Sequence, residues 1–275
     1  MRIENIDPTI NERKFYLPQD EDGKILNPAA ISHISNEDRE SLVTLTDTYM
    51  ECLPDNLHSL YVRGTTVRES KYKPLDIDTF AITLSPISKE EREELNRRLS
   101  VLSIALGTRI DDSTIALSSL NMSSRIGYYR SFEMKTQSLC VYGDDLSTYI
   151  PDFFISPELA YMLLDDIPLG TEKTLKKLEL ANSSNERINI ISKQMKRSLR
   201  AGHLLIIDKI GRFSRDVETC AADLVSEYPE QSTLFASFLK GAVGLSSDIP
   251  DASRLLEQFN IWYSAAYNLF LKNRV

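Results

Sequence analysis

Cysteine and histidine are scarce in this sequence, and neither follows a disulfide or metal-binding pattern. The chain of 275 residues contains three cysteines and three histidines. The cysteines, Cys52, Cys140 and Cys220, lie far apart and share no CxxC spacing, which argues against a disulfide framework and a cysteine zinc site. A metal site would have to be built from carboxylates, which favour hard cations such as Mg²⁺.

Long apolar runs and an excess of positive charge are also absent. No window approaches the roughly 20 apolar residues of a membrane helix, and charges stand where a signal peptide would need an apolar stretch. The formal net charge of −8 argues against non-specific binding of duplex DNA over the whole surface. We therefore expect a cytoplasmic protein that binds neither a membrane nor duplex DNA.

The hydrophobic pattern changes near residue 155. Before this point, helix and strand patterns alternate after a polar arm over 1–36, whereas only helical periodicity recurs after it. The sequence therefore predicts an α+β fold, in which a domain at 1–155 has a small mixed β-sheet flanked by helices and a domain at 156–275 is an all-α helical bundle. Helices are expected at 36–52, 88–106, 157–165, 171–181, 186–210, 216–227, 230–244 and 250–272, and strands at 60–62, 77–84 and 109–118.

The most informative stretch joins a glycine turn to two aspartates. The first strand ends at Gly64-Thr65, where backbone amides can approach a phosphate and the threonine hydroxyl can donate to it. Ten residues later, Asp76 and Asp78 stand at i and i+2 of the next strand, so both lie on one face, about 6.5 Å apart along the backbone. Two such carboxylates can converge on Mg²⁺, with a triphosphate supplying further oxygens.

An Asp-x-Asp pair also occurs by chance, usually in a loop or at a solvated edge. Here it lies within the segment 75–82, whose other residues are mostly apolar. Because burying two like charges without a partner is costly and a cation offsets that cost, we interpret Asp76 and Asp78 as metal ligands.

These motifs resemble the glycine-serine … Asp-x-Asp signature of the polymerase-beta-type nucleotidyltransferases. Two later regions resemble the aminoglycoside adenylyltransferase branch, so the resemblance spans roughly 57–245. Thr65 replaces the usual serine and Leu75 stands where a serine commonly precedes the first aspartate, but neither change removes a metal ligand. The later regions are Cys140-Val141-Tyr142-Gly143-Asp144-Asp145-Leu146 and Ile210-Gly211-Arg212-Phe213, the second followed by Ala221-Ala222-Asp223 and Tyr228-Pro229-Glu230.

The resemblance implies a magnesium-dependent nucleotidyltransferase that transfers AMP from ATP to a hydroxyl acceptor and releases pyrophosphate. It implies that Gly64 and Thr65 hold a phosphate of the donor. Arg212 follows Gly211 at the place of a cationic phosphate-binding residue. Arg63 and Arg68 flank the glycine turn, and Arg68 is the better candidate of the two because Arg63 continues the strand.

The family also implies a third carboxylate, which acts as general base. Its candidates are Asp111 and Asp112. If Ile115 and Leu117 face the core, alternation turns Asp112 toward the paired aspartates, so we predict Asp112 as catalytic residue and metal ligand. A register slip of one residue would select Asp111 instead.

The acceptor is left open by the sequence. Residues 172–215 hold eleven Lys or Arg against four Asp or Glu, and the stripe Lys193, Arg197 and Arg200 is either a solvated helix face or a positive wall against the triphosphate. Basic residues at 193–196 would repel a polycationic aminoglycoside. The acceptor is therefore expected to be another small molecule, a protein hydroxyl or a nucleic acid end.

The alternative function is a nucleotide-binding regulatory or toxin–antitoxin-type module of this fold without turnover. Two further features favour structural roles. His203 is expected to be a packed or partly exposed histidine, and the aromatic stripe of the last helix is expected to pack in the core rather than stack on a nucleobase. This stripe consists of Phe259, Trp262, Tyr263 and Tyr267.

Overall fold

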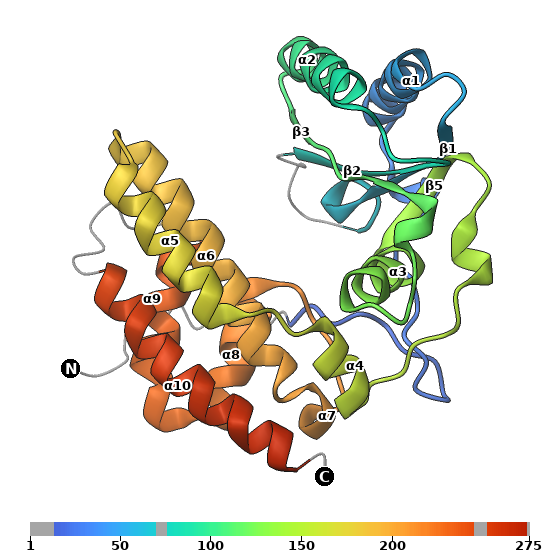
Figure 1. Ribbon diagram of the computed structural model, residues 1–275. Coiled ribbons are helices and arrows are strands. Elements are labelled where there is room, and N and C mark those ends of the chain that lie inside the picture. Colours follow the sequence, from blue (N-terminus) through green and yellow to red (C-terminus); the bar gives the residue numbers. More distant parts are fainter. Residues whose placement is uncertain (1–13, 70–75, 245–251, 274–275) are drawn as a thin grey trace. The chain divides into compact units, whose positions relative to one another are not determined.

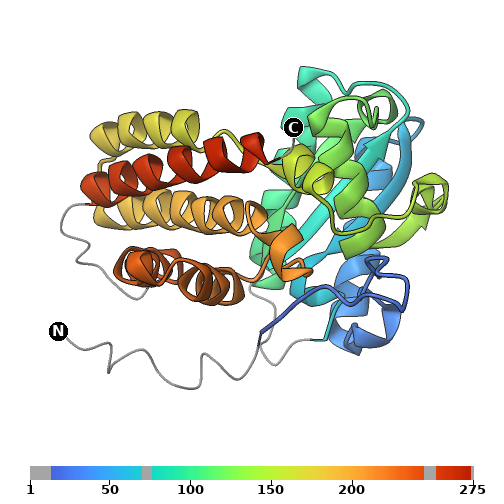
Figure 2. The same ribbon diagram turned by 90° about the horizontal axis from the view of Figure 1, so that it is seen from below.

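The chain forms two compact units in the structure, a computed structural model (Figures 1 and 2). The first unit comprises Pro18–Phe154, and the second comprises Ile155–Val275 together with the segment that ends at Leu17. The predicted domains, 1–155 and 156–275, stay a proposal. Residues 14–69, 76–244 and 252–273 are described, so the departure noted at Leu75 lies outside the described residues.

A mixed β-sheet forms the centre of the first unit. Its strand order is β3-β2-β1-β5, and β4 also pairs with β2. β1 is antiparallel to β2 and β5, whereas β3 and β4 run parallel to β2. The α+β class with a small mixed sheet is therefore confirmed. The strands are β1 (Leu57–Arg63), β2 (Asp76–Thr83), β3 (Arg109–Asp111), β4 (Thr114–Ala116) and β5 (Ser138–Gly143).

Helices cover both faces of this sheet (Figure 1). On one face, α1 (Asn36–Cys52) and α2 (Lys89–Leu106) bury a core that contains Leu45, Leu60 and Leu95. On the other face, α3 (Arg125–Gln137) covers a smaller cluster of buried residues, Tyr61, Phe80, Ile82 and Met134. Burial of apolar side chains on both faces fixes the strand register, because a slip of one residue would exchange the two faces.

The two expected helices of the first unit each begin after a serine cap. The Ser35 hydroxyl accepts a hydrogen bond from the amide of Asp38, and Ser88 forms a capping box with Glu91. The sequence analysis missed α3 and β5. Arg125–Gln137 has no single apolar side, so its periodicity did not stand out, although it packs against the sheet.

The second unit is a bundle of helices in which α6 contacts α5, α8, α9 and α10. The predicted all-helical texture after residue 156 is confirmed for the described residues. Figure 2 shows α5, α6 and α10 as neighbouring helices. The helices are α4 (Pro157–Leu163), α5 (Ile167–Leu180), α6 (Ser184–Leu204), α7 (Ile207–Ile210), α8 (Val217–Glu227), α9 (Ser232–Ala242) and α10 (Ala252–Lys272).

Aromatic residues of α10 pack in the core of this bundle, as predicted. Phe259 is fully buried and stacks on Phe238 with ring centroids 4.5 Å apart. Trp262 meets Phe235 edge-on at 4.9 Å. The rings of Tyr263 and Tyr267 stack at 6.1 Å.

The predicted basic stripe on α6 is partly engaged within the bundle. Arg197 donates two hydrogen bonds to the carboxylate of Asp165, at 2.5 and 2.9 Å, and Arg200 Nε donates to the carbonyl of Arg215. Lys193 is exposed. These contacts favour a structural role for the two arginines over a phosphate-binding wall.

His203 is fully buried in the bundle and is paired with Asp223. Asp223 accepts hydrogen bonds from His203 Nε2 at 3.0 Å, from the Tyr16 hydroxyl at 2.8 Å and from Lys14 Nζ at 2.7 Å. The Phe15 amide donates to Thr219 Oγ1 at 2.8 Å. The segment 14–17, predicted as part of an irregular arm, is therefore anchored on the helical unit. None of the described helices is both long and apolar enough to cross a membrane.

The His203–Asp223 pair predicts a loss of stability at high pH. Burial opposes the positive charge of His203, but Cys220 and Asp223 outweigh it and raise the pKa of His203 from 6.5 to about 9. A pKa raised in the folded state gives stability that is fully present below about pH 6.5 and is lost as the pH rises through about 9.

We expect the free energy of unfolding to fall between pH 6.5 and 10 by an amount on the order of 3 kcal/mol. Urea titrations of the wild type and of His203→Gln across this range would measure it. His203→Gln should flatten the dependence, and His58→Gln in the first unit should leave it unchanged. An equally steep dependence in His203→Gln would contradict the assignment.

Candidate active site

A tight turn at the end of β1 brings the backbone next to Asp78. Gly64 has φ +83°, which favours glycine. A Cβ on Gly64 would lie 2.9 Å from Asp78 Oδ2, closer than side chains tolerate. Thr65 is half-buried in the same 3-10 turn, η3 (Gly64–Thr66). Thr66 Oγ1 donates to the carbonyl of Asp76 at 3.4 Å, which ties the turn to the start of β2.

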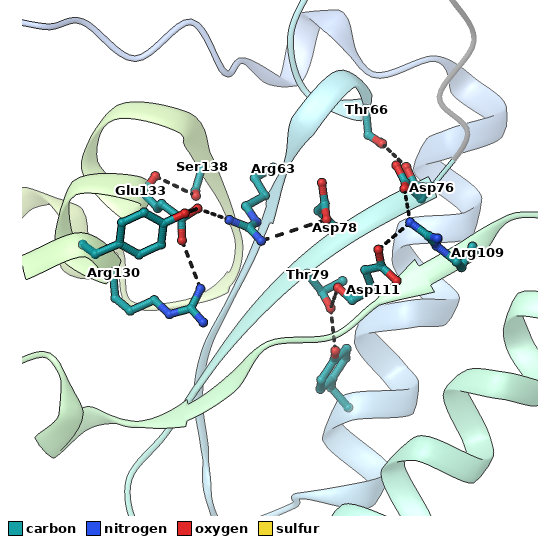
Figure 3. Close-up of polar contacts among 12 residues, drawn as sticks. Arg63, Thr66, Asp76, Asp78, Thr79, Arg109, Asp111, Arg130, Glu133 and Ser138 are labelled. Atoms are coloured by element: carbon teal, nitrogen blue, oxygen red, sulfur yellow. Dashed lines mark hydrogen bonds and ion pairs between the residues drawn. The ribbon is translucent and has the colours of Figure 1, made fainter. Parts of the chain in front are cut away.

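Charged residues gather on one face of the sheet beside this turn (Figure 3). Arg63 on β1 lies opposite Asp78 on β2, and Asp78 lies opposite Asp111 on β3. Asp76 lies opposite Arg109 in the same register. Residues directly paired across strands share a face, and so do residues at i and i+2. The predicted pair Asp76 and Asp78 is therefore joined by a third carboxylate, Asp111.

Arg109 bridges two members of this acid row, which we define as Asp76, Asp78 and Asp111. Its Nη2 lies 2.5 Å from Asp76 Oδ2 and 2.6 Å from Asp111 Oδ2. The Arg109 side chain is 58% exposed, so this contact is open to water and to exchange with other cations. The position between Asp76 and Asp111 is thus one where positive charge is stabilised.

Asp78 lies opposite Asp111 and two residues from Asp76, and its side chain is half-buried. Partial burial raises the pKa of its carboxyl above the ordinary value, and the Arg63 guanidinium opposes this increase. The carboxylates of Asp76 and Asp111 raise it further. Burial and like charge both disfavour the ionised form here, so a cation at this point would be bound favourably.

The prediction that Asp112 faces the paired aspartates is wrong. Asp112 lies on the opposite face, under α1 and α2, where its oxygens accept from Tyr49 at 2.6 Å and from Arg92 Nη1 at 2.6 Å. Thr114 Oγ1 also donates to it at 2.8 Å. Burial and the Asp112 charge raise the pKa of Tyr49 well above its ordinary value, so this hydroxyl keeps its proton and donates.

The error came from the assignment of faces. The alternation itself holds, because Asp111 and Ile115 share a face as expected. That face is apolar farther along the strands, where Ile115 and Leu117 pack against Phe80. The acid row and this apolar cluster lie on the same side of the sheet. Ile115 and Leu117 therefore face the side that also carries the aspartates, not the side opposite to them.

A buried carboxylate from α3 completes the charged face. Glu133 is 2% exposed and accepts from Arg63 Nη1, from the Tyr129 hydroxyl at 2.8 Å and from Arg130 Nη1 at 3.0 Å. Arg63 Nη2 lies 4.0 Å from Asp78 Oδ1. Arg63 therefore stands between Glu133 and Asp78 (Figure 3).

The other predicted phosphate-binding residues, Arg68 and Arg212, belong neither to the acid row nor to the Gly64 turn. Arg68 is half-buried in the bend that follows η3, whereas Arg63, which we had ranked below it, faces the acid row. Arg212 belongs to the helical unit, where its guanidinium lies over the ring of Tyr16 at 5.1 Å. Each keeps its role in phosphate binding only as a proposal.

Sequence reasoning missed Arg109, Arg130 and Glu133. A usable signal was present, since Tyr129 and Arg130 stand four and three residues before Glu133, the spacings at which side chains meet on a helix. Without a predicted helix at 125–137, that spacing carried no meaning. Arg109 looked like an ordinary residue at the start of a strand.

The acid row suits a hard divalent cation by donor type, since carboxylate oxygens on paired strands are the ligands that Mg²⁺ prefers. Among the residues described, however, no three His, Cys, Asp or Glu side chains are gathered closely enough to hold a metal ion. The Arg109 bridge shows that a cation is accommodated between Asp76 and Asp111. To hold a metal ion there, the carboxylates would have to turn toward it and Arg109 would have to give up its place between Asp76 and Asp111.

Among solved structures, the chain is similar to spectinomycin adenyltransferase AAD(9) from Enterococcus faecialis, determined with ATP and spectinomycin. The TM-score is 0.57 and the identity 10%, over 82% of this chain and 99% of that chain.

This likeness shows a shared fold, and it confirms at the level of the fold the resemblance to aminoglycoside adenylyltransferases that the sequence suggested. No protein-family model matches the chain. No curated protein matches it either.

The placement of the two adjacent aspartates predicts effects of different size on stability. Asp112→Asn should lower the free energy of unfolding by about 2–3 kcal/mol, because the half-buried Arg92 and the fully buried Tyr49 lose a charged partner. Asp111→Asn should change it by less than about 1 kcal/mol, because Asp111 and Arg109 are exposed. Urea denaturation of both variants beside the wild type tests this, and a larger loss in Asp111→Asn would sink the assignment of faces.

Proposed function

We propose that the protein is a magnesium-dependent nucleotidyltransferase that transfers AMP from ATP to a hydroxyl acceptor and releases pyrophosphate. The observation that carries the proposal is the acid row of Asp76, Asp78 and Asp111, which lies on one sheet face beside the Gly64 turn. The fold shared with an adenylyltransferase whose structure contains ATP supports the choice of donor.

Each residue of the site has a place in this reaction. Asp76 and Asp78 would hold the magnesium ion, with Asp111 as the third carboxylate. When bound, the ion would supply positive charge to the phosphate oxygens of the donor. Gly64 and Thr65 would bind a phosphate through backbone amides and the hydroxyl.

Asp111 replaces Asp112 as the proposed general base. It would accept the proton of the acceptor hydroxyl as the oxygen forms a bond to the α-phosphorus of ATP. The bond from the α-phosphorus to the bridging oxygen breaks, and pyrophosphate leaves with that oxygen. The contacts of Asp112 with Tyr49 and Arg92 on the other face support this choice of Asp111.

The acceptor carries a hydroxyl and is neutral or anionic. Lys193 and Lys196 lie on α6, in the stretch whose basic residues would repel a polycation. A small molecule, a protein hydroxyl and a nucleic acid end remain the three classes to compare.

We expect pyrophosphate release from ATP that requires Mg²⁺, a hydroxyl acceptor and the acid row. Asp78→Asn and Asp111→Asn should each lower kcat at least about 100-fold, because a metal ligand or the base is lost. Asp112→Asn is the matched control and should retain most of the activity at a temperature where it stays folded. Release measured with a panel of acceptors, with and without EDTA, decides the matter, and full activity in Asp111→Asn would exclude it as base.

The alternative function is a nucleotide-binding module without turnover, in a regulatory or toxin–antitoxin setting. The Arg109 bridge favours it, because a resident guanidinium competes with a metal ion for Asp76 and Asp111. If this alternative holds, ATP binds tightly and no acceptor gives pyrophosphate.

If Arg109 only lowers the affinity for the metal, Arg109→Ala should lower the Mg²⁺ concentration for half-maximal pyrophosphate release several-fold, which a magnesium titration measures.

A further inference from the structure

Glu133 is a buried charge that the proposed reaction does not use. Its side chain is 2% exposed, and its two oxygens are shared between Arg63 and Arg130, with the Tyr129 hydroxyl as a further donor. A buried carboxylate is maintained only where it is fully paired. One carboxylate that binds two guanidinium groups leaves one positive charge in excess.

This excess positive charge lies next to the acid row. Arg63 is the last residue of β1 and lies opposite Asp78, directly before the Gly64 turn. Arg130 packs instead over the Phe80 ring at 5.5 Å. Of the two arginines on Glu133, Arg63 is therefore the one that is held next to the proposed phosphate-binding turn.

The guanidinium of Arg63 has an N–H group without a hydrogen-bond acceptor among the described residues. Its Nη1 is taken by Glu133, but Nη2 is 4.0 Å from Asp78 Oδ1, which is too long for a hydrogen bond. Its Nε is buried and has no hydrogen-bond partner in the part of the chain that the structure describes. An unsatisfied buried donor is costly, so this group is poised for an acceptor that arrives with a ligand.

The charge of the described part of the site indicates what that ligand is. Among the residues that the structure describes there, four carboxylates (Asp76, Asp78, Asp111, Glu133) against three guanidinium groups (Arg63, Arg109, Arg130) leave a net charge of −1. A divalent cation on the acid row would reverse this sign to +1 and would compete with Arg63 for Asp78. The guanidinium would then face a site that attracts an anion.

We propose that Arg63 binds a phosphate group of the nucleotide donor and that Glu133 is the positioning residue that holds its guanidinium in place. This proposal rests on the proposed function and names a further contact of the same site. A guanidinium matches phosphate because its planar fork presents parallel N–H donors. Glu133 uses one edge of that fork and leaves the rest for the ligand.

The first test measures phosphate binding without catalysis. Isothermal titration calorimetry with inorganic tripolyphosphate, in the presence of Mg²⁺, reports phosphate contacts without a nucleobase. Arg63→Gln should weaken binding at least about tenfold, and Arg63→Lys should restore only part of it. The matched control is Arg97→Gln, an exposed arginine of α2 paired with Glu94, which should bind as the wild type does.

The second test separates positioning from mere stability. Glu133→Gln keeps the shape but loses the charge, and it should weaken tripolyphosphate binding about as much as Arg63→Gln. If Glu133 acts through Arg63, the double variant is no weaker than Arg63→Gln alone. Glu133→Asp, which keeps the charge but shortens its reach, replaces Glu133→Gln if the latter fails to fold. Additive losses in the double variant would overturn the positioning role.

Kinetics distinguish failure of this proposal from failure of the function. Arg63→Gln should raise the KM for ATP at least about tenfold, with a smaller change in kcat. ATP turnover that depends on Asp78 but is unaffected by Arg63→Gln, with unchanged tripolyphosphate binding, would overturn the role of Arg63 and leave the reaction standing. Absence of turnover in the wild type, with tripolyphosphate binding that still requires Arg63, would remove the reaction and keep the anion site.

Discussion

The first unit must offset the repulsion among three carboxylates that share one face of its sheet. Asp76, Asp78 and Asp111 are brought together by strand register, which apolar burial on both faces enforces. Left alone, such a row would be destabilising. Arg63 and Arg109 flank it and offset part of the charge. The glycine at position 64 belongs to the same constraint, because only a residue without a side chain lets the backbone pass so near Asp78.

Much of this fold follows from local sequence signals. The serine caps, the mostly apolar run of β2 and the helical texture after residue 156 depend on neighbouring residues, so they can be recognised without a structure. The pair Asp76 and Asp78 was equally legible, because two carboxylates in an apolar strand are costly on their own. By contrast, α3 lacks a single apolar side, so its sequence does not mark it as a helix. The contacts of its residues become apparent only when β1 and β2 lie against it.

The exchange of Asp112 for Asp111 has a more general reason. A single strand shows which residues share a face, but it does not show what covers each face. Here both faces are buried, and one of them changes from charged to apolar along its length. The partners of Asp112, Tyr49 and Arg92, come from two different helices, so no spacing in the sequence announces them. Glu133 was hidden for the same reason, since Arg63 is 70 residues away.

The anchoring of Lys14 and Tyr16 on Asp223 makes the first unit an insertion within the second. The chain leaves the helical unit at Leu17, builds the whole sheet unit, and returns at Ile155. Lys14 and Asp223 are separated by 209 positions along the chain. During synthesis the sheet unit is complete before α8 is made, so it can fold as one continuous piece. At that stage the segment 14–17 has no Asp223 to contact. Closure of the helical unit is therefore a late event that joins both ends of the inserted unit.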